Sequence, residues 1–404
     1  MKIAFFISTV RKENNGIGGH YFSLINIANE ISKKHEVYII NIGIKESLAL
    51  KHSELPIINI IGNSLLPFFR FKKLKKIIAE KKIEILHAFD IQSFFWARIL
   101  ANQLKIPIIL NKCGGPNPEN YYPYTKNLIV FSKENYDFFT SNEKYANSNI
   151  SLIPNRVIPF QTDRFRMESL KNKYNLYRYE FILLRITRLG SYYQECNIQL
   201  INLFKRLKAD GINVCLLFVG TLEDNNIKKE YLNVDQDIFI ESENEFTNNA
   251  KELIGIADCV LGTGRSFMEA ANQGKIMLAP CKNSPIPLLV TETNFDSFLN
   301  TNFSERYYNA NINIEENYNK LKDLIYNPQL KKNYETFIIN KFETHFNLKN
   351  AISKYENIYK TISFEPESYY GDLIKNFYQY WKFEVKELLN KIYKIKNDKN
   401  NIRN

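Results

Sequence analysis

Short apolar runs alternate with longer segments of helical apolar spacing from the first residues of the chain. This alternation is typical of a parallel β-sheet covered by helices. The run Lys2–Ile7 predicts a buried first strand, and Phe22, Ile25, Ala28 and Ile31 recur at helical spacing behind it. The other elements predicted in this half are strands at 36–43, Pro56–Ile61, Ile83–Ala88, Pro107–Leu110 and Leu128–Phe131 and helices at Phe71–Lys82 and Ser93–Leu104. The pattern predicts a first doubly wound domain.

The pattern breaks near Ile153, where LIPNRVIPF leads into a polar stretch that ends at about Tyr179. Two prolines in nine residues favour a connection between domains. A second series follows, with strands at Phe181–Ile186, Val214–Gly220, Asp237–Ile240, Asp258–Leu261 and Lys275–Ala279 and helices at Ile198–Ala209, Asn248–Gly255 and Ser266–Gln273. The predicted domains are 1–165, 175–345 and a helical extension, 346–404, that is aromatic and basic after Pro366.

Composition limits the class of protein. The chain has 404 residues, enough for two cores, and its 45% hydrophobic and 24% charged residues are ordinary for a globular protein. Its five cysteines show no metal or C-x-x-C spacing, which favours buried free thiols in a reducing cytoplasm. No window approaches the roughly 20 apolar residues of a spanning helix. The net charge of +11 fits nucleic acid or an anionic membrane, and no nucleic-acid-binding motif is present.

Glycines mark the loop between the first strand and the first helix. Gly16, Gly18 and Gly19 would let backbone N–H groups approach an anion or a sugar at the helix N-terminus. The spacing is not G-x-G-x-x-G, and no acidic residue closes the second strand, so a dinucleotide site is disfavoured. A flexible turn explains these glycines equally well.

The segment IADCVLGTGRSFMEAANQGK carries the strongest signal. A buried strand ends in Gly262-Thr263-Gly264, and the helix that follows begins near Ser266, which predicts free amides and a helix dipole suited to a phosphate. Glu269 lies about one turn into this helix. Its carboxylate could accept hydrogen bonds from the two hydroxyls of a ribose, or it could merely favour the helix dipole.

Two arginines lie at the end of the first strand of the second series. Arg185 and Arg188 occur there in the segment LLRITRLG, where a guanidinium can hold a diphosphate bidentately. Arg265 has the same possible role. An exposed arginine at the end of a strand is the alternative interpretation. Two doubly wound domains in series predict a cleft between the carboxyl ends of their sheets, and all these residues are expected there.

In the order of these segments the chain resembles the family 4 glycosyltransferases, which are retaining enzymes of the GT-B fold. The resemblance covers about residues 1–360 and includes GIGGH, EVYII, EILHAFD, IPNRV, the strand before Arg188, LLFVG and ADCVLGTGRSFMEAANQGK. It implies an α/β protein with two facing Rossmann-like doubly wound domains, an N-terminal acceptor domain and a C-terminal donor domain.

The resemblance also implies roles for individual residues. Glu269 matches the family glutamate that binds the donor ribose, and Arg188 matches the arginine that binds the diphosphate. Glu241 would lie near the base, and Gly18 and Gly19 would face the donor phosphate and the acceptor.

The chain also departs from the family pattern. Leu261 replaces the first glutamate of the family motif, and the family lysine after the arginine is absent from SYYQECN. Cys113-Gly114-Gly115 replaces the family's His-Gly, which leaves His87 as the strand-end histidine. We therefore expect His87, Arg188 and Glu269 as catalytic residues, with the donor held by Gly18, Gly19, Arg188, Glu241, Gly262, Thr263, Gly264, Arg265, Ser266 and Glu269.

The predicted reaction moves a hexose from a nucleoside diphosphate, UDP before GDP, to a hydroxyl of a saccharide or lipid-linked acceptor in bacterial surface polysaccharide synthesis (capsule, O-antigen or lipopolysaccharide). Retention of the anomeric configuration follows from the resemblance. No D-x-D triplet ends a strand, so neither a metal nor a cofactor is expected. A UDP-sugar 2-epimerase and a non-catalytic scaffold of the same fold are the alternatives.

Two basic aromatic stretches, FFRFKKLKKIIAEKK and FYQYWKFEVKELLNKIYKIK, could lie on an anionic membrane. A solvated helix face is the alternative. The expected location is the cytoplasm, at the inner face of the cytoplasmic membrane.

Overall fold

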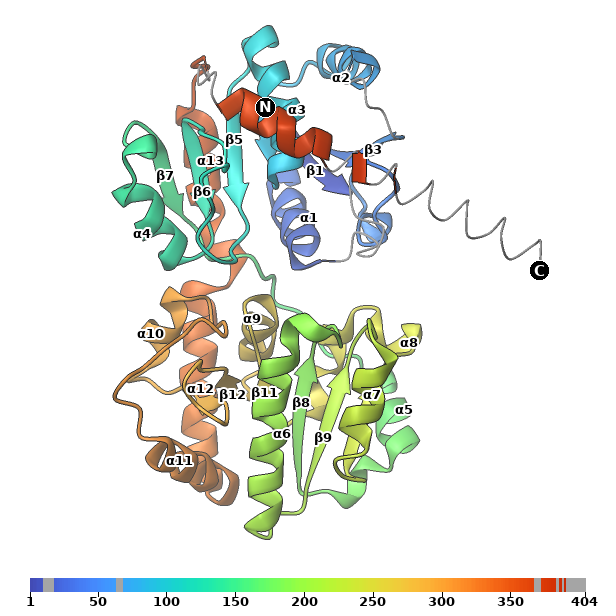
Figure 1. Cartoon of the computed structure of the whole chain (residues 1–404), viewed down its shortest axis with the longest axis vertical. Helices are drawn as coiled ribbons and strands as arrows, with labels where there is room; N and C mark the ends of the chain where they lie inside the picture. Colours follow the sequence, from blue (N-terminus) through green and yellow to red (C-terminus); the bar gives the residue numbers. More distant parts are fainter. Residues whose placement is uncertain (10–17, 63–67, 367–371, 383–384, 387–388, 390–404) are drawn as a thin grey trace, which may run out of the picture. The chain divides into compact units, whose positions relative to one another are not determined.

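The computed structural model of the protein describes residues 1–9, 18–62, 68–366, 372–382, 385–386 and 389. The chain divides into two compact units. The first contains residues 1–156 and 348–404, and the second contains residues 157–347 (Figure 1). The C-terminal segment therefore belongs to the same unit as the N-terminus.

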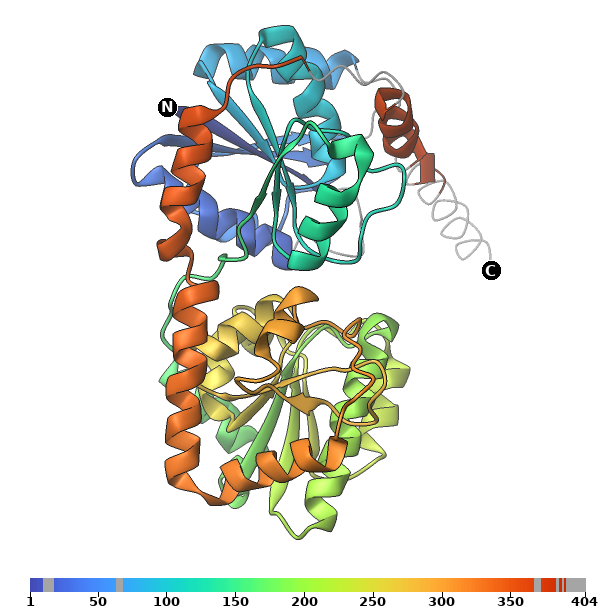
Figure 2. The same cartoon turned by 90° about the vertical axis from the view of Figure 1, so that its left-hand side faces the viewer.

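The first unit is built on a seven-stranded sheet in the order β3-β2-β1-β4-β5-β6-β7. All its strand pairs are parallel. Its strands are β1 (Lys2–Thr9), β2 (Glu36–Gly43), β3 (Ile57–Ile61), β4 (Ile85–Ala88), β5 (Ile108–Lys112), β6 (Asn127–Val130) and β7 (Asn149–Leu152). Its helices are α1 (Gly19–Ser32), α2 (Phe68–Lys81), α3 (Ile91–Leu104), α4 (Lys133–Ser141) and α13 (Ile352–Thr361). The reversal of strand order beside β1 requires helices on both faces of the sheet, as Figure 2 shows.

The second unit repeats this design with a six-stranded sheet in the order β10-β9-β8-β11-β12-β13. Only β13 is antiparallel. Its strands are β8 (Phe181–Ile186), β9 (Val214–Val219), β10 (Ile238–Glu241), β11 (Cys259–Leu261), β12 (Ile276–Ala279) and β13 (Leu288–Leu289). Its helices are α5 (Arg164–Tyr174), α6 (Gln194–Ala209), α7 (Asn225–Leu232), α8 (Asn244–Thr247), α9 (Arg265–Asn272), α10 (Phe295–Asn300), α11 (Ile314–Tyr326) and α12 (Pro328–His345).

Both sheets are buried on their two faces, as their unbroken apolar strands predict. Every residue of β9 is buried, as are the residues of β1 from Ile3 onward. The predicted α/β class with two doubly wound sheets is confirmed. All five cysteines are free, four of them are buried and Cys113 is half-buried.

The polar stretch after Ile153 differs from the prediction. It contains α5, which begins where the side chain of Asp163 accepts a hydrogen bond from the N–H of Arg166 at 3.1 Å. Leu170 is the one fully buried residue of this helix. The sequence of the helix therefore shows almost no periodic spacing of apolar residues. The helix predicted at Asn248–Gly255 is instead a 3-10 helix, η5 (Ala250–Ile256).

The C-terminal segment packs on the first unit through a helix at residues 372–382. The ring of Tyr380 stacks on Phe95 of α3 with a centroid distance of 5.1 Å and meets Trp96 edge-on at 5.2 Å. The Tyr380 hydroxyl accepts a hydrogen bond from Nη1 of Arg70 at 2.6 Å. These contacts fix the helix against α3 and the start of α2 (Figure 1).

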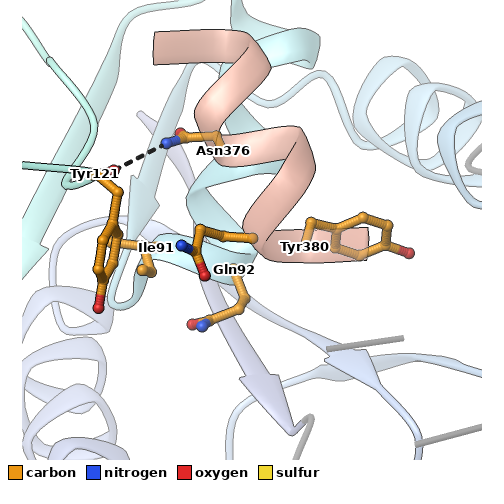
Figure 3. A pocket seen from close by; sticks show the side chains of 6 residues that line it. Ile91, Gln92, Tyr121, Asn376 and Tyr380 are labelled. Atoms are coloured by element: carbon orange, nitrogen blue, oxygen red, sulfur yellow. Dashed lines mark hydrogen bonds between the residues drawn. The ribbon is translucent and has the colours of Figure 1, made fainter. Parts of the chain in front are cut away.

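Polar contacts complete this attachment. Oδ1 of Asp372 accepts a hydrogen bond from Nζ of Lys144 at 2.8 Å. The side-chain amide of Asn376 donates to the carbonyl of Tyr121 at 3.5 Å, as Figure 3 shows. Residues 372, 376 and 380 are one helical turn apart and form the buried face of this helix. The crevice beside it has a volume of about 10 Å³ and room for about one water molecule.

We predict that Tyr380→Ala detaches the helix at 372–382 without unfolding the sheet. The substitution removes a buried aromatic ring, a change that typically costs about 3–5 kcal/mol, and the remaining contacts of this short helix are few. Hydrogen exchange at residues 372–382 should become fast. Tyr378→Ala is the matched control because Tyr378 is 58% exposed on the same helix. Equal exchange in both variants would contradict the prediction.

Candidate donor-binding site

Except for Glu241, the predicted donor residues of the second unit follow two neighbouring strands. β11 pairs with β8 in parallel, with Cys259 opposite Leu183 and Val260 opposite Leu184. Because parallel neighbours end at the same edge of a sheet, Arg188 after β8 and the loop after β11 lie at one edge. The structure thus brings Arg188 and the segment from Gly262 to Glu269 to the same end of the sheet.

The turn from β11 into α9 requires glycine at two positions. A Cβ atom on Gly262 would lie 2.4 Å from the Cα of Phe267, closer than such atoms approach. Gly264 has φ +50° and ψ −117°, a conformation that suits glycine. Side chains close the turn, because the Ser266 hydroxyl accepts from the N–H of Thr263 at 3.1 Å and donates to its carbonyl at 3.0 Å.

The prediction that this turn leaves free amides is wrong for four residues. The N–H groups of Gly262, Gly264 and Ser266 donate to backbone carbonyls at 3.0, 3.0 and 3.2 Å, and that of Thr263 donates to Ser266. These four donors are occupied inside the unit.

Glu269 and Arg265 form an ion pair on α9. Nε of Arg265 lies 2.8 Å from Oε1 of Glu269, and each side chain is only 12% exposed. Lys251 lies close enough for Glu269 to raise its pKa, but burial of the ammonium outweighs this and lowers the pKa of Lys251 from its usual value. A carboxylate and two cationic side chains thus gather beside α9.

The side chain of Arg188 is more exposed to solvent than those of Arg265 and Glu269. Its side chain is 38% exposed, and Nη1 lies 3.1 Å from Oε1 of Glu223. Its guanidinium lies 5.6 Å from the ring centre of Tyr193. Burial would lower the pKa of Arg188, but Tyr193 and Glu223 together raise it. The guanidinium is charged and oriented before any ligand arrives.

Glu241 occupies a different environment from the one predicted. It is the last residue of β10, and only 1% of its surface is exposed. Its Oε2 forms an ion pair with Nζ of Lys173 at 2.8 Å. Oε1 accepts from the N–H of Glu243 at 2.7 Å. These contacts occupy both carboxylate oxygens, so the side chain fixes the end of β10 and the structure does not support a contact with a nucleotide base.

Three predicted residues belong to the first unit. Gly18 caps α1 in an extended conformation with φ −72°, and Gly19 is the first residue of that helix. Gly16 lies outside the described residues. His87 lies on β4, fully buried, and its Nδ1 forms a hydrogen bond of 2.9 Å with the Tyr359 hydroxyl.

The catalytic role expected of His87 is not supported by this position. The ring packs against Phe5, Phe89 and Tyr355, with centroid distances of 5.1, 4.9 and 6.4 Å. Burial lowers the pKa of the imidazole to about 3. A neutral ring enclosed by aromatic side chains cannot contact an acceptor, and we interpret His87 as a core residue that joins β4 to α13.

Some side chains that interact with Arg188 and Glu269 were not predicted from the sequence. Glu223, Tyr193 and Lys251 lie on loops or short helices without periodic signal, and only the three-dimensional fold brings them to the cationic side chains. A hollow of about 240 Å³ in the second unit is lined by other, mostly polar residues, including Thr291, Asn309 and Lys320. In the described part of the chain, no three His, Cys, Asp or Glu side chains form a metal-binding cluster.

Solved structures share this fold. HepE of Anabaena in complex with UDP and glucose aligns over 89% of this chain and 100% of its own, with TM-score 0.63 and 13% identity. A glycosyltransferase of Rickettsia africae aligns over 89% and 97%, with TM-score 0.65 and 18% identity. MnaA of S. aureus, solved with UDP, aligns over 88% and 97%, with TM-score 0.53 and 14% identity. The chain therefore has the two-domain α/β fold of these proteins.

Sequence comparisons add no family. No protein-family model matches the chain, and no curated protein matches it.

We predict that His87 makes the protein less stable in acid. The folded pKa of about 3 lies below the roughly 6.5 of an exposed histidine, so the unfolded chain binds a proton that the folded one does not. Stability from this group is complete above pH 6.5 and is lost as the pH falls towards 3. At pH 5 the loss is about 2 kcal/mol.

Denaturant unfolding of the wild type and of His87→Asn at pH 7 and pH 5 measures this loss. The wild type should lose about 2 kcal/mol more than the variant between the two pH values. An identical loss in both proteins would contradict the prediction.

Proposed function

We propose that this chain is a metal-independent glycosyltransferase that uses a nucleoside-diphosphate sugar, with UDP as the preferred nucleotide and GDP as the next. The observation that carries the proposal is the placement of Arg188 and of the Arg265–Glu269 pair after neighbouring parallel strands, β8 and β11. The shared fold with HepE, a protein solved with UDP and glucose, supports the choice of UDP.

In this proposal Glu269 binds the ribose hydroxyls of the donor and Arg188 binds its diphosphate. The bond between the anomeric carbon and the diphosphate oxygen breaks, a bond from that carbon to the acceptor oxygen forms, and the proton of the acceptor hydroxyl passes to the departing diphosphate. Fixed positive charge near the departing diphosphate stabilises the charge that develops on it. Arg188 and Arg265 supply that charge, and retention of configuration remains part of the proposal through the family resemblance.

We assign the acceptor, a saccharide or lipid-linked hydroxyl of a bacterial surface polysaccharide, to the first unit. An exposed apolar stripe there supports a membrane-bound acceptor. Ile374, Tyr378 and Trp381 are 71%, 58% and 44% exposed and lie one helical turn apart, opposite the face that packs on α3. Phe69 is 80% exposed at the start of α2, which the hydrogen bond between Arg70 and Tyr380 ties to the same helix.

Helix α2, which begins with Phe68 and Phe69, also carries four exposed lysines, namely Lys72, Lys73, Lys75 and Lys76. Apolar rings with lysines around them suit an anionic membrane surface, where each lysine contributes about 1 kcal/mol. None of the described helices is long and apolar enough to cross a bilayer. We therefore propose peripheral attachment at the cytoplasmic membrane.

A UDP-sugar 2-epimerase is the second candidate, and the shared fold with a putative UDP-N-acetylglucosamine 2-epimerase of Listeria monocytogenes, with TM-score 0.53 and 11% identity, favours it. An epimerase converts UDP-sugar without an acceptor, whereas a transferase shows only slow hydrolysis. Incubation with UDP-sugars in the absence of acceptor, followed by chromatography of the sugar, separates the two. A non-catalytic scaffold would produce neither product.

We predict that Glu269→Ala lowers the affinity for uridine and for UDP by the same factor, at least about tenfold. Hydrogen bonds to a charged group are worth about 1.5–3 kcal/mol, and the ribose is common to both ligands. Glu269→Gln should lose less. Calorimetric titration with uridine, UDP and GDP gives the affinities.

Glu316→Ala is the matched control for this substitution, because Glu316 forms a similar i,i+4 pair with Lys320 at 2.7 Å in the same unit. Its nucleotide affinity should equal that of the wild type. If Glu269 served only its pair with Arg265, the alanine variant would lose about 0.2–0.5 kcal/mol of stability and bind nucleotide normally. That result would refute the ribose assignment.

We predict that the double substitution Ile374→Ser and Trp381→Ser weakens binding to anionic liposomes at least about tenfold. Burying one such side chain in an apolar phase is worth about 1.5–3 kcal/mol. These exposed positions are preferable to a truncation, which would remove Tyr380 and bare Phe95. Liposome sedimentation measures the binding, and Tyr326→Ser, 64% exposed in the other unit, is the control. Unchanged sedimentation would remove the membrane proposal.

A further inference from the structure

Arg185 is a fully buried arginine on β8, three residues before Arg188. Burial lowers the pKa of its guanidinium below the usual value, yet arginine stays protonated in proteins. Removing an ion from water costs several kcal/mol unless a counter-charge and hydrogen bonds replace the water. The contacts of this side chain therefore show whether its charge is balanced.

A single hydrogen bond holds the guanidinium within the described part of the chain. Nη1 of Arg185 donates to the carbonyl of Leu261 at 3.0 Å. Nε is buried and has no hydrogen-bond partner among the described residues. Leu261 is the last residue of β11, so the bond reaches the start of the glycine turn that leads into α9.

Among the residues that the structure describes, no carboxylate lies within ion-pair distance of Arg185. Burial raises the pKa of the Cys196 thiol to about 11, so the sulfur is protonated at neutral pH. Burial also raises the pKa of Tyr231, so its hydroxyl is neutral at neutral pH. Glu305 interacts with Arg185 by Coulomb attraction without an ion-pair contact. The carboxylate of Glu305 instead lies 3.8 Å from Nη1 of Arg306.

The other two arginines at this edge of the sheet each form an ion pair. Arg188 pairs with Glu223, and Arg265 pairs with Glu269. Tyr193 joins Arg185 to Arg188, because its ring centre lies 5.8 Å from one guanidinium and 5.6 Å from the other. The unbalanced charge thus lies between Arg188 and the turn after β11.

We propose that the counter-charge of Arg185 is the diphosphate of the bound donor, so that Arg185 is a positioning residue that selects a diphosphate over an uncharged nucleoside. This inference rests on the proposed function and names the part of the donor that Arg185 senses. Arg185 acts on the ligand through the low-dielectric interior and through Tyr193 and Leu261, because its own atoms are buried. The buried charge of Arg185 destabilises the protein without ligand, and the bound anion offsets this cost.

The test compares ligands with and without the diphosphate. Arg185→Met removes the charge but keeps an apolar side chain of comparable length. We expect its affinity for UDP to fall at least about tenfold while its affinity for uridine stays within about twofold. The melting temperature of the ligand-free variant should equal or exceed that of the wild type, because the unbalanced charge is gone.

Two results would overturn the inference. Unchanged UDP affinity would show that the charge is not sensed, and equal losses for UDP and uridine would show that Arg185 only shapes the turn after Leu261. Arg185→Lys keeps the charge and should retain most of the preference for UDP over uridine. If the methionine variant does not fold, a lysine variant that loses this preference overturns the inference, and one that keeps it supports the inference.

Arg98→Met is the matched control, because Arg98 is a buried arginine of α3 in the other unit. Its ratio of UDP to uridine affinity should match that of the wild type. Titration of the wild type with inorganic pyrophosphate separates this inference from the proposed function. Pyrophosphate binding that Arg185→Met abolishes, without binding of uridine, UDP or GDP, would sustain the anion site and refute the sugar-nucleotide function.

Discussion

The pairing of β11 with β8 is the interaction on which the candidate site depends. The two strands share only the registers Cys259 with Leu183 and Val260 with Leu184, and the Arg185–Leu261 hydrogen bond continues the contact by one residue. This pairing joins segments more than 70 residues apart in the chain and places their following loops side by side. A shift of one residue would turn the side chains of β11 to the opposite faces and move the glycine turn away from Arg188.

The cations at this edge are arranged in two ways. Arg188 and Arg265 carry their own carboxylates, so an incoming anion must compete with Glu223 or share Arg265 with Glu269. Such internal pairs hold a guanidinium in place and limit binding of stray anions. Arg185 has no such partner, and the protein bears an unbalanced charge there. The site therefore combines two paired arginines, Arg188 and Arg265, with the buried Arg185, for which the described structure shows no ion pair.

Much of the fold could be predicted because strands such as β1 and β9 are continuous apolar runs and helices such as α3 and α6 have apolar residues at helical spacing. Helix α5 escaped prediction because Leu170 is its one fully buried residue, and β7 because it follows a polar loop and is only partly buried. At the candidate site the sequence predicted that Arg188, Arg265 and Glu269 are close together. It could not reveal that Glu241 and His87 are enclosed, because their partners, Lys173 and Tyr359, come from distant parts of the chain.

The second unit begins and ends at one point, because the N–H of Val157 donates to the carbonyl of Phe346 at 3.2 Å and Val157 bridges Asn347. This closure has a consequence for synthesis on the ribosome. Helix α13, which covers His87 with Tyr355 and Tyr359, emerges only after residues 157–347 have been made, a delay of roughly 10–40 s at 5–20 residues per second. The second unit has its complete sequence first, and the nascent first unit has part of its core uncovered during this interval, a state that promotes aggregation.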